Sequence, residues 1–165
     1  QSYRRQYGFD AICAMPTNLY GPGDNYNLDT SHVLPALIRK IHEAKQTGAE
    51  TVEIWGTGKP LREFLHVDDL ADAAVFLMSR YSNPEIVNIG TGQDLSIREL
   101  AERIAGIIGY NGKLAFNPGK PDGTPRKLLD TGKIHAMGWQ HKLDLGIGIT
   151  ATITWYERHA QIPQA

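Results

Sequence analysis

Short apolar runs alternate with amphipathic helical segments along this chain, and this alternation constrains the fold more than any other feature. Apart from Asp10, residues 9–15 form a short apolar run without a polar alternation, which is typical of a strand buried on both faces of a parallel sheet. Residues 32–44 place apolar side chains along one face of a helix, for which Ser31 is the expected cap. The sequence therefore predicts an α/β fold.

The rest of the chain continues this alternation, with Gly-, Pro- and Asn-rich loops between the elements. Ser96 and Glu99 have the spacing of a capping box, which predicts a helix that ends near Ile108. Further strands are expected at residues 51–55, 64–66 and 86–89, further helices at residues 67–80, 131–137 and 143–159, and long loops at residues 16–30 and 117–127.

The first residues have the pattern of a helix end. Residues 1–7 are followed by Gly8, a residue that commonly terminates helices. A helix of this length is marginal in water by itself, and no Met precedes it. We therefore expect the chain to begin inside an element whose first half lies elsewhere. The length of 165 residues suits one ordinary domain and is too short for two.

Charge and composition restrict the kinds of partner. The formal net charge is −1, whereas nucleic-acid-binding proteins usually carry a clear basic excess. No stretch approaches the roughly 20 consecutive apolar residues that a membrane span needs. Cys13 is the single cysteine, so no internal disulfide can form, and no Cys/His group has metal-ligand spacing. We expect a cytoplasmic protein without a metal that binds small molecules or other proteins.

The loop at residues 16–30 follows directly from the first expected strand. In open α/β sheets, ligands bind outside the carboxyl ends of the strands. Asn18 offers an amide donor and acceptor, and Gly21 and Gly23 allow the backbone to approach a ligand closely. The alternative interpretation is an ordinary surface loop, and the loop alone does not decide between the two.

His32 stands at the expected start of a helix. The positive end of a helix dipole disfavours imidazolium, which suits proton transfer near neutral pH. The alternative is a surface or capping histidine, which is the more common role of an isolated His. We assign that common role to the other histidines, namely His42, His66, His135, His141 and His159.

Basic side chains recur in loops and at helix starts instead of in solvated runs. Lys40 lies two helical turns beyond His32 and is expected on nearly the same helix face. Arg62 follows a Gly-rich turn, while Arg126 and Lys127 close a loop rich in Pro and Gly. Guanidinium groups form forked bonds to phosphate oxygens, and Lys supplies a point charge. This distribution favours a ligand that carries phosphate.

Two further side chains suit the rest of such a ligand. Trp55 can stack on a base or a sugar, although a Trp that ends a strand is more often a core residue. Asp122 can accept hydrogen bonds from ribose hydroxyls or from purine amino groups. Together with the basic residues they suggest a diphosphate with a ring at one end.

Five segments carry a resemblance to a known family. The motifs are Met-Pro-Thr-Asn-Leu-Tyr-Gly-Pro (15–22), Trp-Gly-Thr-Gly (55–58), Arg-Glu-Phe-Leu-His-Val-Asp-Asp (62–69), Asn-Ile-Gly-Thr-Gly (88–92) and Lys-Pro-Asp-Gly-Thr-Pro-Arg-Lys (120–127). They resemble extended short-chain dehydrogenases, and the third and fifth are particularly similar to the GDP-L-fucose synthase family. The fifth motif is the most specific, and the resemblance covers nearly the whole chain.

The resemblance implies an NADP-dependent enzyme that acts on GDP-4-keto-6-deoxymannose, epimerises C3 and C5, and reduces C4. His32 matches a histidine that acts as acid and base with a cysteine during epimerisation. The residues that the family's pattern puts on the cofactor side are Pro16, Thr17, Asn18, Leu19 and His32. The residues expected to bind the substrate, a GDP-sugar, are Lys40, Trp55, Arg62, Asp122 and Lys127.

The resemblance also implies an organisation. Residues 1–15 end a dinucleotide-binding domain, and residues 16–165 form a small mixed α/β substrate-binding region, of which residues 64–92 pack back on the Rossmann sheet. The chain would then be the C-terminal part of the enzyme. The glycine-rich loop, a Ser, the Tyr-x-x-x-Lys motif and the cysteine partner of His32 are expected before Gln1, so these residues alone are expected to be inactive and to leave apolar surface exposed. Complete members are usually homodimers.

Two alternatives stay open beside this interpretation. Another nucleotide-sugar epimerase or reductase of the same superfamily would share most of the motifs. A module that binds a nucleotide-sugar without catalysis would need only the substrate-binding residues.

Overall fold

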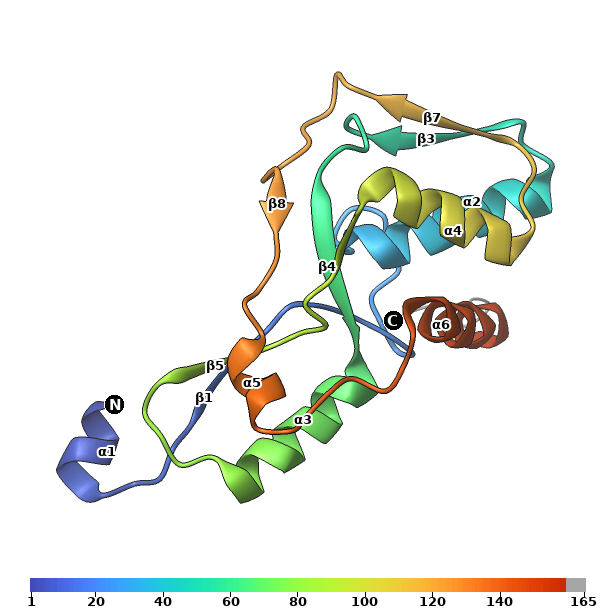
Figure 1. Ribbon diagram of the computed structural model, residues 1–165. Helices are drawn as coiled ribbons and strands as arrows, with labels where there is room; N and C mark the ends of the chain where they lie inside the picture. Colours follow the sequence, from blue (N-terminus) through green and yellow to red (C-terminus); the bar gives the residue numbers. More distant parts are fainter. Residues whose placement is uncertain (160–165) are drawn as a thin grey trace.

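The computed structural model describes residues 1–159, and Figure 1 shows how helices and strands alternate along them. The helices are α1 (Ser2–Tyr7), α2 (Val33–Thr47), α3 (Val67–Arg80), α4 (Ile97–Ile108), α5 (Gly132–Ala136) and α6 (Leu145–His159). The strands are β1 (Cys13–Pro16), β2 (Asn18–Tyr20), β3 (Thr51–Trp55), β4 (Leu61–His66), β5 (Ile86–Ile89), β6 (Asp94–Ser96), β7 (Lys113–Asn117) and β8 (Arg126–Lys127). The predicted α/β class is confirmed.

Strand β4 is shared by several pairings. Its first half pairs antiparallel with β6 and parallel with β8, and its second half pairs parallel with β2. Strands β1 and β5 form a separate parallel pair, and β3 and β7 form another. In Figure 1, β4 runs from the β3–β7 end of the molecule towards the β1–β5 end. It therefore connects the two ends.

Two separate groups of buried apolar side chains make up the core. The larger group includes Ile38, Leu100, Ile104 and Ile149, which are fully buried among α2, α4 and α6. These three helices lie beside one another in Figure 1. The smaller group lies among β4, β5, α3 and α5 and consists of Leu65, Ala73, Leu77, Val87, Ile89, Ile134 and Trp139.

Local signals place several element ends correctly. The predicted bounds of β3, α3 and β5 match those of the structure. The capping box of α4 is present, because Ser96 accepts a bond from the Glu99 N–H while Glu99 accepts one from the Ser96 N–H. Helix α1 ends at Gly8, whose φ of 64° is in the left-handed region. His66 is a capping histidine, as assigned, since its Nδ1 accepts from the Asp68 N–H at 3.2 Å.

Strand β1 differs from its prediction in length and in burial. It begins at Cys13, and all four of its residues are exposed. Val87 and Ile89 of β5 pack in the smaller core, but no layer of the described residues covers the opposite face of the β1–β5 pair, which carries Met15 and Ile86. The predicted burial on both faces is therefore wrong for this chain, whereas the expected exposure of apolar side chains here is confirmed.

Other differences arise where long-range partners decide the structure. Ser31 does not cap α2, because the N-cap position is occupied by His32, while Ser31 lies in the preceding turn, where its N–H donates to the Asn27 carbonyl at 2.8 Å. Strands β2, β6, β7 and β8 lie in segments without a clear strand pattern. They form because β3 or β4 offers each of them an edge to pair with.

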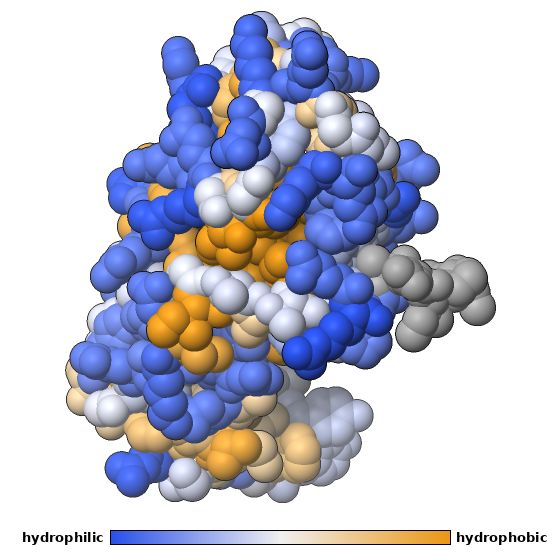
Figure 2. All heavy atoms as spheres, turned by 90° about the vertical axis from the view of Figure 1, so that its right-hand side faces the viewer, coloured by the Kyte–Doolittle hydropathy of each residue, from blue (hydrophilic) through white to orange (hydrophobic). Residues whose placement is uncertain are grey.

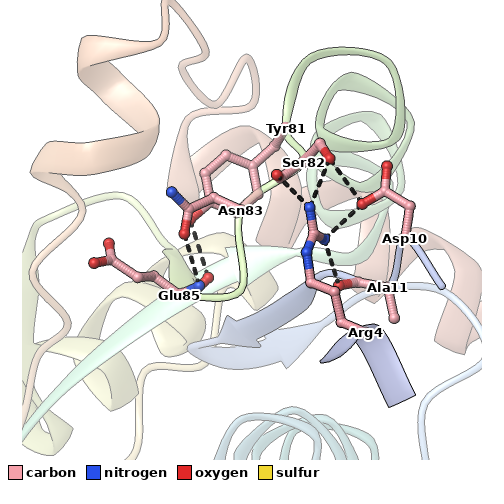
Figure 3. Close-up of polar contacts among 7 residues, drawn as sticks. All are labelled: Arg4, Asp10, Ala11, Tyr81, Ser82, Asn83 and Glu85. Atoms are coloured by element: carbon pink, nitrogen blue, oxygen red, sulfur yellow. Dashed lines mark hydrogen bonds and ion pairs between the residues drawn. The ribbon is translucent and has the colours of Figure 1, made fainter. Parts of the chain in front are cut away.

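Helix α1 is attached by polar contacts, since it contributes no buried residue. Figure 3 shows the Arg4 guanidinium between Asp10 and Ser82, with Nη1 2.6 Å from Asp10 Oδ1 and Nη2 2.6 Å from the Ser82 carbonyl oxygen. The Ser82 hydroxyl also donates to Asp10. Bonds from Ser82 and Arg4 lower the pKa of the exposed Asp10 carboxyl. These contacts join the start of the chain to the segment after α3.

The surface on the α6 side of the molecule is mostly polar, with several separate apolar areas in Figure 2. Among the described helices, none has both the length and the apolar character needed to cross a bilayer.

The larger core predicts a clear difference between two positions of one helix. Ile104 in α4 is fully buried, whereas Ile107, three residues later, is 37 % exposed. We expect Ile104→Ala to lower the free energy of unfolding by about 2–5 kcal/mol, because it removes buried methyl groups and leaves a cavity. Ile107→Ala changes helix propensity equally and should cost much less. Urea denaturation of both variants tests this, and similar losses would contradict the assignment of the core.

Candidate functional site

A cavity of about 790 Å³ opens at the carboxyl end of β1. Residues 15–24 form one wall and residues 126–129 form the other, with His32 and Val67 completing the lining. This volume is within the roughly 300–1,000 Å³ of small-molecule sites. The cavity therefore lies at the strand ends where the sequence predicts ligand binding.

The first wall is held in place by β4 and β5. The Thr17 N–H donates to the Ile89 carbonyl at 3.0 Å. The Thr17 hydroxyl and the Asn18 side-chain amide both donate to the main-chain carbonyl of Glu63, at 3.3 and 2.7 Å. Residues 18–20, which were expected within a loop, pair with β4 as a strand, and the Asn18 bond gives its side chain a fixed orientation at the cavity.

Gly21 continues this wall under steric restriction. A Cβ atom at this position would lie 2.6 Å from Val67 Cγ1 and 3.4 Å from the His66 imidazole. Any side chain would push the wall away from the start of α3. The glycine therefore allows the close approach that the sequence predicts, although the neighbour is another part of the chain.

The second wall is attached to the other half of β4. Arg126 and Lys127 form β8, in register with Leu61 and Arg62. The Arg126 guanidinium is neutralised by Asp94, with Nε 2.6 Å from Oδ2. Hydrogen bonding to Arg126 lowers the pKa of the Asp94 carboxyl. The second wall thus has one paired cation and leaves Lys127 at the cavity.

Arg62 and Lys127 form a pair of neighbouring cations. Partners in register project to the same face of a sheet, so the two side chains lie on one side of β4 and β8. Neither has a salt-bridge partner within residues 1–159. Two adjacent positive charges without a counter-charge favour an anionic ligand.

His32 is the N-cap residue of α2, is exposed, and lines the cavity. Its side chain makes no capping hydrogen bond. The structure therefore places an imidazole at the cavity in a position from which it can reach a ligand, although the expected helix began one residue earlier.

Trp55 is at the centre of a second cluster, outside the cavity lining. Its side chain is 55 % exposed, so it is not a core residue. The Nζ atoms of Lys40 and Lys120 lie 5.2 and 5.1 Å from the centre of its ring. Such cation–π contacts hold both ammonium groups near the indole. The cluster offers a flat aromatic surface surrounded by positive charge.

Asp122 connects this cluster to the Gly-rich turn after β3. Its carboxylate accepts bonds from the Thr57 N–H at 2.6 Å and from the Thr57 hydroxyl at 2.7 Å. These bonds lower the pKa of the Asp122 carboxyl. Next to it, Gly123 lies beside the Arg62 guanidinium. Asp122 thus orients the loop that runs from Lys120 towards Arg62.

The structure brings most of the predicted site residues into two adjoining groups. Around the cavity lie Pro16, Thr17, Asn18, Leu19, His32 and Lys127. Around the indole lie Lys40, Trp55 and Asp122, with Arg62 between the two groups. Sequence reasoning missed Lys120 and Glu63. The signal for Glu63 was an acid inside the strand-forming run before His66, where a solvated side chain is not expected.

Comparisons with known proteins identify the family of the chain. The model of the NAD dependent epimerase/dehydratase family matches residues 1–90, which is more than half of the chain. The chain belongs to this family. Within the NAD dependent epimerase/dehydratase family, it is 60 % identical over 156 residues to GDP-L-fucose synthase 1 of Arabidopsis thaliana, covering 94 % of this chain and 48 % of that protein.

Two further family relatives are similar along nearly the whole chain. GDP-L-fucose synthase of Escherichia coli is 48 % identical over 165 residues, covering 94 % of this chain and 51 % of that protein. The crystal structure of a GDP-L-fucose synthetase from Naegleria fowleri bound to NADP superposes with a TM-score of 0.86 at 30 % identity, covering 92 % of this chain and 48 % of that one. The chain spans about half the length of these relatives.

The Asp122–Thr57 contact predicts a pH dependence. Because the carboxyl has a lowered pKa in the folded chain, the contact stabilises the loop above about pH 4 and is lost as the pH falls through the lowered value. Thr57→Val removes the hydroxyl donor and should raise the pKa of Asp122 towards its ordinary value. Thr57→Ser keeps both donors and should not. Carboxyl-carbon NMR titration measures this, and equal values in both variants would refute the contact.

Proposed function

We propose that this chain binds the GDP-sugar substrate of an NADP-dependent epimerase/reductase of the GDP-L-fucose synthase type. The observation that carries the proposal is that Arg62 and Lys127 are neighbouring cations without a salt-bridge partner in the described residues, with Lys127 at the cavity and Arg62 beside the loop that carries Asp122. The similarity to GDP-L-fucose synthases supports it.

The diphosphate is assigned to the two neighbouring cations. Arg62 can form forked bonds to phosphate oxygens, and Lys127 adds a point charge on the same face. The guanine base is assigned to the Trp55 cluster, where the indole and the ammonium groups of Lys40 and Lys120 can contact a ring. Asp122 keeps lone pairs beyond its two bonds to Thr57 and can accept from a ribose or purine donor.

The sugar and the nicotinamide are assigned to the cavity. Pro16 and Leu19 offer apolar surface, while Thr17 and Asn18 are held in fixed positions beside it. When bound, NADPH would supply the hydride for the reduction at C4. His32 would move a proton at the ring carbons during epimerisation. The residues present thus fit the nicotinamide end of the cofactor.

The uncovered face of the β1–β5 pair supports the proposed organisation. Met15 and Ile86 are about half exposed on this face. Exposed apolar sheet surface normally packs against another layer. We assign that layer to a dinucleotide-binding region of the kind that the longer relatives contain, with residues 1–15 and 64–92 packed on it.

Nucleotide selectivity tests the proposal. GDP-L-fucose at 100 times its dissociation constant should stabilise the chain by about 2.7 kcal/mol, and UDP-glucose at the same concentration should stabilise it less. Arg62→Ala and Lys127→Ala should each weaken GDP-L-fucose binding by about tenfold or more, because each removes charge-assisted bonds. Arg80→Ala removes an exposed cation at the end of α3 and is the matched control. Thermal-shift titration measures all four proteins, and stronger stabilisation by UDP-glucose would reject the proposal.

Turnover must be measured separately from binding. The resemblance assigns polarisation of the ketone to a Tyr-x-x-x-Lys motif, which this sequence does not contain. We therefore expect these 165 residues to bind the GDP-sugar without steady oxidation of NADPH. Absorbance at the NADPH maximum with GDP-4-keto-6-deoxymannose as substrate follows the reaction. Steady oxidation would show that the chain is catalytically complete.

A further inference from the structure

Glu63 in β4 is a fully buried acid that the proposed chemistry does not use. Acidic side chains are almost never fully buried unless they are paired. Within residues 1–159, however, no Lys, Arg or His forms a salt bridge with Glu63. A buried carboxylate of this kind must be stabilised by hydrogen bonds alone.

The hydrogen bonds of the Glu63 carboxylate come from two segments. Oε1 accepts from the Gly92 N–H at 2.7 Å and from the Thr91 hydroxyl at 3.4 Å. Oε2 accepts from the Leu129 N–H at 3.1 Å. Leu129 belongs to the second wall of the cavity. One oxygen thus holds the turn after β5, and the other holds the wall that carries Lys127.

The main chain of Glu63 holds the opposite wall. Its carbonyl oxygen accepts from Thr17 and Asn18, which line the cavity on the other side. Glu63 is therefore bonded to both walls of the cavity while it does not line the cavity itself. Gly90 makes room for this arrangement, because a Cβ atom there would collide with the Glu63 carboxylate.

We propose that Glu63 is a positioning residue that fixes the second wall of the cavity relative to the first and thereby sets the affinity for GDP. It acts through the Leu129 N–H, which adds a second attachment, two residues after Lys127, to the segment that β8 already pairs with β4. The effect on GDP rests on the proposed function. The effect on the wall does not.

The hydrogen-bond partners of the Glu63 side chain require a carboxylate at this position. All three partners of the side chain are donors, and a carboxylate accepts through both oxygens. In Glu63→Gln, one oxygen becomes an NH₂ group that would face an N–H donor. The amide oxygen should stay with the Gly92 N–H, because that bond is the shorter of the two backbone bonds, at 2.7 Å against 3.1 Å for Leu129, so Leu129 should lose its acceptor. In Glu63→Asp the charge is kept, but the shorter side chain cannot reach both segments.

Asp69 provides a matched control. It is 3 % exposed, and its carboxylate also accepts bonds from two backbone N–H groups, those of Lys142 and Leu143 at 2.9 and 3.1 Å. None of these three residues lines the cavity. Asp69→Asn therefore disturbs an equivalent buried acid away from the two walls.

The first experiment needs no ligand. Amide hydrogen exchange by NMR should be at least about tenfold faster at Leu129 in Glu63→Gln than in the unchanged chain, since a part-buried bond to a charged group is lost. In Asp69→Asn, exchange at Leu129 should be unchanged. If Glu63→Gln does not fold, Glu63→Asp replaces it with the same expectation. Unchanged exchange at Leu129 in the folded Glu63 variant would overturn the proposal.

The second experiment is calorimetric titration with GDP under conditions in which every variant is fully folded. Glu63→Gln should bind GDP about tenfold more weakly, and Asp69→Asn should bind within about twofold of the unchanged chain. A purely structural role would weaken both or neither, and that result would overturn the proposal. If the unchanged chain does not bind GDP, the proposed function fails, and hydrogen exchange at Leu129 alone decides whether Glu63 positions the wall.

Discussion

The hydrogen-bonded pairing of β4 with β2, β6 and β8 is the interaction on which the rest of the structure depends. Strands β2, β6 and β8 come from distant parts of the sequence, and each is held by β4. Within β4, Phe64 belongs to the larger core and Leu65 to the smaller one, because successive side chains in a strand point to opposite faces. A single strand therefore joins two cores and supports both walls of the cavity.

Elements with local signals could be predicted from the sequence, and elements without them could not. Helix α4 has a capping box and helix α3 has acids in its first turn, and both predictions agree with the structure. Strands β2 and β8 have no such pattern, because they are short and exist only through their partner β4. The burial of β1 was predicted from its apolar composition, but burial depends on a covering layer that composition does not describe.

The same distinction applies to the candidate site. His32 was found because a helix start is visible in the sequence, and the cations were found because of their positions in loops. The role of Glu63 depends on bonds to Leu129 and Gly92, which are distant in the sequence. Similarly, nothing local shows that both oxygens of Asp122 bond to Thr57. Side chains that contact a ligand can be recognised by type, whereas side chains that position others require the structure.

The parallel pairing of β1 with β5 has a consequence for folding kinetics. Cys13 lies opposite Ile86, although α2, β3, β4 and α3 all lie between them in the chain. Closing so long a loop costs conformational entropy, and pairings of high sequence separation form slowly. All four residues of β1 are exposed, so the burial of β1 itself compensates little for this cost. We expect the larger core to assemble first and the β1–β5 pair to be the last part of the chain to close and the first to open.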